Sequence, residues 1–221
     1  MTRSVRLPLE QLQPYLLDVP PPRLPPGQVP SEPPQPLRWS EVFGSEQPVE
    51  IEVGFGKGAF LTQVCQSRPS AHFLGIEIER KYVLMAAGRI AKLAPKNVRL
   101  ACTDAKWFFA HRVAPSSVDV VHIFFPDPWW KNRHKKRKLM SPDFVAEIGR
   151  VLKPGGIFHF KTDVKDYFEQ TQQVLAVEPT LREEPDSTYG LEGAMTNFER
   201  KYRIEGRPIY RAIYAKRDGG C

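Results

Sequence analysis

Short apolar runs alternate with helical stretches five times along this chain, and this alternation limits its possible folds more than any other feature. The runs are rich in β-branched and aromatic residues, as buried strands are. They cover residues 49–53, 73–77, 98–102, 118–125 and 157–161, and helical patterns begin near residues 59, 82, 105, 142 and 164. Strands that alternate with helices predict an α/β fold, with a parallel sheet between two helical layers. An irregular stretch after residue 178 precedes a last predicted strand at 208–215.

The N-terminal residues 1–47 differ in composition from the rest of the chain. Between Pro20 and Pro36, nine of seventeen residues are proline, which excludes helix and sheet and favours extended polyproline segments. Leucines before this run could dock on a globular domain. We therefore predict a proline-rich arm at 1–47 and one domain at 48–221, with a proline-rich ligand for another protein as the alternative for the arm.

The charge of the chain favours an anionic partner. The formal net charge is +7 and the pI is about 9.4, as is common in nucleic-acid-binding proteins. The three cysteines are odd in number and lie in no metal-like or paired spacing, which favours a reducing compartment. No apolar stretch has the length of a signal peptide or a membrane span. Together with the cysteine spacing, this predicts a cytoplasmic protein without a metal site.

The run at 118–125 ends in a stiff acidic turn. Asp127 stands between Pro126 and Pro128, so neither helix nor strand continues through it. A carboxylate at the carboxyl end of a central strand lies where open α/β sheets bind ligands. Six of the eight residues at 131–138 are Lys or Arg. Beside the acidic turn they suggest a polyanionic substrate; the alternative is a solvated charged face.

A second group of residues follows the first three strands. Gly54, Gly56 and Gly58 stand between a strand and a helix, spaced G-x-G-x-G rather than the G-x-G-x-x-G of dinucleotide sites. Glu77 ends the second strand, where it could accept hydrogen bonds from ribose hydroxyls, and Asp104 ends the third, where it could hold an adenine edge. No phosphate-binding loop or lysine clamp accompanies them. The set therefore favours S-adenosylmethionine over NAD, although a tight structural turn would also explain the glycines.

Five motifs together resemble the tRNA (guanine-N7)-methyltransferase family. They are 52–58 (E-V-G-F-G-K-G), 75–77 (G-I-E), 124–129 (F-F-P-D-P-W) with the basic residues after it, 161–163 (K-T-D) and 196–199 (T-N-F-E). The F-P-D-P-W motif is specific to the family, whereas the glycine loop indicates only a class I methyltransferase. The resemblance runs from about residue 48 to 216. It implies a Rossmann-like fold, with a mostly parallel, doubly wound sheet and an antiparallel C-terminal strand.

The resemblance also implies roles for individual residues. The S-adenosylmethionine site would comprise Glu52, Gly54, Gly56, Gly58, Glu77, Asp104 and Asp127, with Asp127 at the point of methyl transfer. The tRNA substrate would contact Lys131, Asp163, Thr196, Asn197, Phe198 and Glu199. The implied target is guanine 46 of the variable loop. The segment from residue 199 to 211 is similar to that of homodimeric members, while other members are monomers.

The implied chemistry suits these residues. Guanine N7 carries an in-plane lone pair, so no proton has to leave, and the base becomes cationic. The Asp127 carboxylate would stabilise that charge and could orient the ring, while Phe125, Trp129 or Trp130 could stack on it. One alternative is an amino-methyltransferase, whose motif has two prolines after the Asn or Asp, one more than here. Another is a catalytically silent RNA-binding module, against which the intact acidic residues argue.

Overall fold

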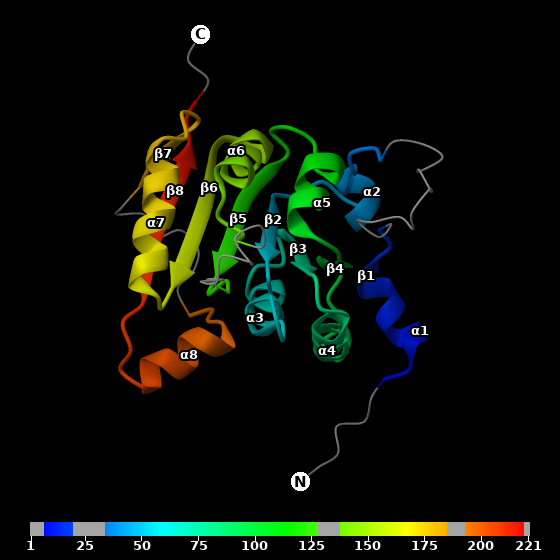
Figure 1. Cartoon of the computed structure of the whole chain (residues 1–221). Coiled ribbons are helices and arrows are strands. Elements are labelled where there is room, and N and C mark those ends of the chain that lie inside the picture. Colours follow the sequence, from blue (N-terminus) through cyan, green and yellow to red (C-terminus); the bar gives the residue numbers. More distant parts are fainter. Residues whose placement is uncertain (1–6, 20–33, 128–137, 185–192, 219–221) are drawn as a thin grey trace, which may run out of the picture.

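The computed structural model describes residues 7–19, 34–127, 138–184 and 193–218 (Figure 1). Its centre is an eight-stranded sheet in the order β1-β4-β3-β2-β5-β6-β8-β7. The strands are β1 (Leu16–Leu17), β2 (Val49–Val53), β3 (His72–Glu77), β4 (Val98–Cys102), β5 (Val118–Phe124), β6 (Leu152–Thr162), β7 (Leu181–Glu183) and β8 (Tyr210–Lys216). All neighbouring pairs from β1 to β6 are parallel, and β8 is antiparallel to both β6 and β7. The predicted α/β sheet with an antiparallel C-terminal strand is confirmed.

Two helical layers cover the sheet. On one face lie α3 (Ala59–Ser67) and α4 (Arg80–Ile90), and on the other α5 (Ala105–Arg112), α6 (Pro142–Val151) and α7 (Lys165–Ala176). Helices α3 and α4 connect β2 to β3 and β3 to β4 on one face of the sheet, whereas α6, between β5 and β6, covers the other face. Right-handed crossovers require this change of face when the strand order reverses. The strand order reverses beside β2, and open α/β sheets bind ligands at the carboxyl ends of the strands beside such a reversal.

The structure corrects the predicted start of β6 and the predicted cap of α6. Strand β6 begins at Leu152, five residues before the predicted 157, because the chain leaves α6 directly into the sheet. The register of β5 and β6 shifts between Val118 and Val120, because these residues pair with Leu152 and Ile157 and the K-P-G-G sequence (153–156) lies between those two partners. Ser141 is the N-cap residue of α6 as predicted, but its side chain does not cap the helix. Its Oγ instead accepts a hydrogen bond from Lys106 Nζ at 3.2 Å.

The stretch after residue 178 contains two elements that the sequence analysis missed. They are strand β7 and helix α8 (Asn197–Ile204). A strand of three residues is too short for a periodic pattern to show. Helix α8 carries a capping signal, because the hydroxyl of Thr196 accepts from the backbone N–H of Glu199 at 3.0 Å. The sequence T-N-F-E has the Thr-x-x-Glu spacing of a capping box, so this helix could have been found from sequence.

Part of the N-terminal segment packs on the sheet. The segment forms α1 (Leu9–Leu12), a 3-10 helix (Gln13–Tyr15) and β1, which pairs Leu16 with Leu100 of β4. Leu12 is buried, so the predicted docking of these leucines is confirmed. Helix α2 (Trp39–Phe43) packs on the α5 face. Residues 20–33, most of the proline-rich run, lie outside the described residues, and the division of the chain at residue 48 stays a prediction.

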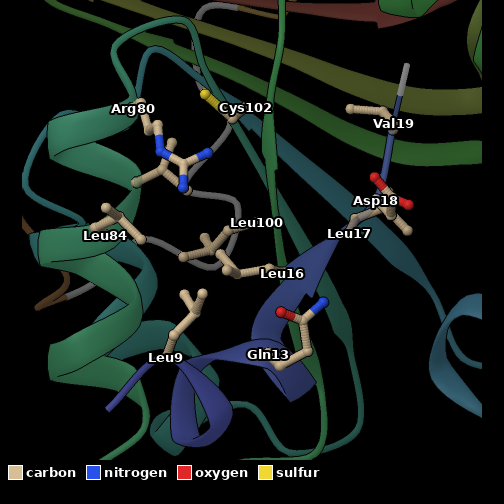
Figure 2. Close-up of a pocket in the computed structure, with 11 residues that line it drawn as sticks. Leu9, Gln13, Leu16, Leu17, Asp18, Val19, Arg80, Leu84, Leu100 and Cys102 are labelled. Atoms are coloured by element: carbon tan, nitrogen blue, oxygen red, sulfur yellow. The ribbon is translucent and has the colours of Figure 1, made fainter. Parts of the chain in front are cut away.

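A pocket of about 330 Å³ lies between the N-terminal segment and α4. Figure 2 shows Leu9 and Leu16 of the N-terminal segment opposite Arg80 and Leu84 of α4, with Cys102 at the end of β4. Its walls are mainly leucine and valine, and its charged side chains, Arg80 and Asp18, are exposed. Across the described ranges of the chain, no helix is both long and apolar enough to span a bilayer.

Candidate functional site

Five adjacent parallel strands each carry an acidic residue at or just beyond the carboxyl end. In sheet order from β4 to β6 these residues are Asp104, Glu77, Glu52, Asp127 and Asp163. All five were predicted as site residues, and the parallel arrangement brings them to one edge, the lower edge of the sheet in Figure 1. A row of acidic residues at the carboxyl ends of adjacent strands favours a cationic ligand.

The glycine loop connects β2 to α3 at the centre of this edge. Gly54, Gly56 and Gly58 have φ values of 75°, 53° and 71°, in the left-handed region that favours glycine. At Gly58 a Cβ would lie 2.6 Å from the Cβ of Ala86 in α4, so a side chain has no room there. The loop is therefore a tight turn that also leaves its backbone open to a ligand.

Glu77 is held between the glycine loop and the segment after β3. Its Oε2 accepts from the N–H of Gly56 at 3.0 Å, and its Oε1 accepts from the N–H of Glu79 at 3.1 Å. A carboxylate offers about four acceptor positions, so both oxygens keep capacity for ligand hydroxyls. Ile78, next in the chain, is 63% exposed, an apolar side chain beside two acidic residues that the sequence analysis did not single out.

Glu52 is a buried carboxyl with one oxygen that lacks a partner. The residue is 3% exposed, and its Oε2 accepts no hydrogen bond from the described part of the chain. Burial, and then the nearby charge of Glu77, raise the pKa of Glu52 to about 8. Buried acceptors are rarely left unpaired, because the unmade bond costs free energy. Glu52 is therefore suited to meet a donor or a cation that enters beside the glycine loop.

Asp104 serves the helix that follows it. It is the N-cap residue of α5, and its Oδ1 accepts from the N–H of Trp107 at 3.0 Å. This confirms the helix start that the sequence predicted. The residue is half-buried and lies just beyond β4, at the same edge of the sheet as Glu77.

The turn that carries Asp127 begins with a strained residue. Phe125 has a φ of 51°, which costs about 1–3 kcal/mol for a residue other than glycine. Its N–H donates to the carbonyl oxygen of Lys161 at 2.7 Å, and its ring lies 5.4 Å from that of Tyr202 and 6.3 Å from that of Phe198, centroid to centroid. These contacts hold the left-handed turn, and Asp127 is exposed two residues later.

Several predicted site residues follow this turn and lie outside the described residues. They are Trp129, Trp130, Lys131 and the basic run up to residue 137. At the far end of that gap, Lys106 of α5 donates to the carbonyl oxygen of Lys138 at 2.8 Å.

Tyr167 of α7 is also affected by Asp127. Burial, with a smaller contribution from the charge of Asp127, raises the pKa of Tyr167 to about 12. A protonated phenol thus lies near the Asp127 turn, from an element that the sequence analysis did not connect with it.

Helix α8 crosses the same edge of the sheet below β5 and β6 (Figure 1). Its N-cap and first turn contain four of the six residues predicted to contact substrate, of which Asn197 and Phe198 are exposed and Thr196 and Glu199 buried. Glu199 pairs with Lys161 at the end of β6 and with Arg203 one turn further along α8, at 2.9 and 2.8 Å. The structure therefore brings the 196–199 segment close to β6.

Asp163, just beyond β6, is also connected to this region. Its carboxylate forms an ion pair with Arg207, whose guanidinium lies 4.1 Å from the ring centroid of Tyr202. The predicted substrate residues that the structure describes thus form a group around α8 and the end of β6. The predicted cofactor residues line the edge from β4 to β5.

Comparison with solved structures supports the fold. The 16S rRNA methyltransferase KamB has a TM-score of 0.57 and 15% identity, over 81% of this chain and 93% of that one. A phosphoethanolamine N-methyltransferase of Haemonchus contortus, solved with S-adenosylhomocysteine, has a TM-score of 0.51 and 15% identity, over 82% of this chain and 51% of that one. At such identities the likeness shows a methyltransferase-type fold alone.

Sequence comparison identifies the family. Residues 46–212 match a family model described as "Putative methyltransferase". A tRNA (guanine-N(7)-)-methyltransferase of Rhodopirellula baltica is 42% identical over 201 residues, which cover 86% of this chain and 74% of that protein. One of Paraburkholderia xenovorans is 39% identical over 195 residues, 87% of this chain and 74% of that protein. The chain belongs to the tRNA (guanine-N(7)-)-methyltransferase family.

Proposed function

We propose that this protein transfers a methyl group from S-adenosylmethionine to N7 of guanine 46 in the variable loop of tRNA. The names of its relatives support the reaction and the substrate. The observation that carries the proposal is the row of carboxylates around the glycine loop, which suits a cationic adenosine ligand better than a phosphorylated one. The target position rests on the motifs that resemble the family.

The cofactor-binding residues would contact different parts of the ligand from three strand ends. Glu77 would accept from the ribose hydroxyls, because its carboxylate is already fixed by two backbone donors. Asp104 would hold an edge of the adenine, and the exposed side chain of Ile78 would pack on the ring. Glu52 would meet the cationic end of the ligand, since its unpaired buried oxygen lies beside the glycine loop. When bound, S-adenosylmethionine supplies the methyl group on a cationic sulfur.

Asp127 would act where charge develops on the substrate. The lone pair of guanine N7 forms the new bond, so this protein needs no general base. The purine gains a positive charge in the reaction, and a carboxylate held in place stabilises it. The contacts of Phe125 hold the turn, so Asp127 needs little reorganisation at the moment of reaction.

The tRNA would lie across α8 and the end of β6. The exposed Asn197 and Phe198 are suited to touch the RNA, while Thr196 and Glu199 hold the start of the helix. Asp163 would act at the same face, and Lys131 beyond the Asp127 turn. The net charge of +7 supports a polyanionic substrate. A cytoplasmic location is part of this proposal and rests on the cysteine spacing and on the lack of a signal-peptide-like stretch in the sequence. The resemblance is compatible with a monomer or a homodimer and favours the homodimer.

The test is product analysis after incubation with tRNA and S-adenosylmethionine. N7-methylguanosine, found by mass spectrometry of nucleosides, is the expected product, and a tRNA with adenine at position 46 is the matched control. A neutral N-methylated amine would instead indicate an amino-methyltransferase. Cofactor and tRNA binding without any product would indicate a silent RNA-binding module.

A further inference from the structure

Lys161 is a buried cation at the carboxyl end of β6. The residue is 7% exposed, and its Nζ lies 2.9 Å from Oε2 of Glu199 and 5.2 Å from the ring centroid of Phe124. Burial lowers the pKa of Lys161, and Glu199 opposes that shift. A buried charge is tolerated only when it is paired, so the fit of Lys161 into the sheet depends on α8 being in place.

Glu199 is occupied on both of its carboxylate oxygens. Oε2 pairs with Lys161, Oε1 pairs with Arg203, and the residue is 2% exposed. A buried carboxylate with two cationic partners is poorly placed to meet an RNA phosphate, which carries the same sign of charge. Its neighbours Asn197 and Phe198 are the exposed members of the segment. The contacts of Glu199 are thus those of a residue that holds α8, not of one that touches substrate.

The backbone of Lys161 connects the same point to the Asp127 turn. Its carbonyl oxygen accepts from the N–H of Phe125 at 2.7 Å, the bond that closes the left-handed turn. The ring of Phe125 in turn packs on Phe198 and Tyr202 of α8. One residue therefore joins the end of β5, the end of β6 and the first turn of α8.

We propose that Lys161 is a positioning residue that couples the tRNA-contacting face of α8 to the Asp127 turn, and that Glu199 acts through Lys161. The proposal deepens the proposed function and rests on it. Loss of either partner should release α8 and loosen the turn, so it should change both the KM for tRNA and kcat. The cofactor edge from β4 to β2 is built from other contacts and should be unaffected.

A double-mutant cycle tests this coupling. We expect Lys161→Met and Glu199→Gln each to lower kcat/KM for tRNA by about tenfold or more, with the Kd for S-adenosylmethionine changed by less than about twofold. The double variant should be no worse than the poorer single variant, because it removes both charges and leaves neither unpaired. Lys161→Arg, which keeps the cation, should recover part of the loss.

A matched control removes another lysine near the end of β6. Lys165, in the first turn of α7, is exposed and pairs with Glu169 at 3.7 Å on the surface. Lys165→Met should leave kcat and the stability of α8 unchanged.

A direct contact between Glu199 and tRNA predicts a different double-mutant cycle, in which Lys161→Met has little effect or the two losses multiply. Either result would overturn the proposal.

Hydrogen exchange of the α8 amides gives a readout that needs no activity. Exchange should be faster in Lys161→Gln/Glu199→Gln, a pair that leaves no buried charge and keeps the test open if Lys161→Met does not fold. Wild-type exchange rates in α8 of this variant would contradict the proposal. If the wild-type protein made no N7-methylguanosine, the proposed function would fail, while the exchange experiment would still report on the coupling.

Discussion

At the scale of single residues, the site depends on carboxyl groups whose surroundings differ. Glu52 is buried with an unpaired oxygen, Glu77 is held by two backbone donors, and Asp127 is exposed at the end of a strained turn. Residues of the same chemical type are therefore suited to different tasks, because burial and hydrogen bonding decide which of them is charged and which is fixed.

The pKa of Glu52 predicts a pH-dependent stability. Since folding raises this pKa from 4.5 to about 8, the folded state binds the proton more tightly, and stability should fall as pH rises through that window. Glu52→Gln should remove this slope and be more stable than wild type at pH 8, by on the order of a few kcal/mol, with no difference below about pH 4.5. Urea unfolding of the cofactor-free protein at several pH values measures it. The exposed Glu46→Gln is the control, and equal slopes in wild type and Glu52→Gln would contradict the assignment.

Asp127 is expected to act on the reaction more than on cofactor binding. Asp127→Asn should lower the single-turnover rate by about 10²–10³, the usual loss when a group that stabilises developing charge is removed. Its Kd for S-adenosylmethionine should change by less than about twofold. Rapid-quench measurement gives the rate and calorimetry the Kd, with the exposed Asp166→Asn of α7 as control. Equal losses in both quantities would make Asp127 a cofactor ligand.

At the scale of elements, α8 positions the residues that we propose to contact substrate. Its helix start depends on the hydroxyl of Thr196, which accepts from the N–H of Glu199. Contacts with β6 and with the end of β5 then place the first turn near Asp127. The cofactor edge, in contrast, is built from the ends of β2, β3 and β4 and the turns after them.

Removal of the helix cap should therefore affect tRNA more than cofactor. Thr196→Ala should cost about 1 kcal/mol of stability, as loss of an N-cap hydroxyl usually does, and should raise the KM for tRNA. Thr196→Ser keeps the hydroxyl and should behave like wild type. Thermal unfolding and steady-state kinetics provide the measurements. A Thr196→Ala variant with unchanged KM would show that the helix start has no part in tRNA binding.

At the scale of the whole molecule, the positive charge is expected to attract tRNA to the proposed site. Each phosphate contact that displaces condensed counterions adds about 0.7–0.9 to the log–log dependence of affinity on salt. Replacing Lys135 and Lys136 with alanine should therefore reduce that slope by about 1.4–1.8, without changing which guanine is methylated. The matched control is Lys92→Ala/Lys96→Ala, two exposed lysines between the end of α4 and the start of β4, at the opposite edge of the sheet. An unchanged slope in Lys135→Ala/Lys136→Ala would move the RNA surface to the basic residues of α8.

Much of the fold could be predicted from local sequence. Strands β2 to β5 agree with the predicted runs within one residue, because strands of a parallel sheet are buried on both faces and read as short apolar runs. The short strands β1 and β7 were missed, since two or three residues show no period. Helix α8 was missed although its Thr-x-x-Glu signal was present.

The sequence by itself determined the α/β alternation and the acidic residue at each strand end, because parallel strands share one edge and local order along the chain places each residue on it. Only the tertiary structure decided how these groups are paired. Lys161 and Glu199 lie 38 residues apart and meet because α8 returns across the end of β6. The raised pKa of Glu52 likewise depends on what surrounds it. Pairing and desolvation are set by distances through space, which no pattern along the chain contains.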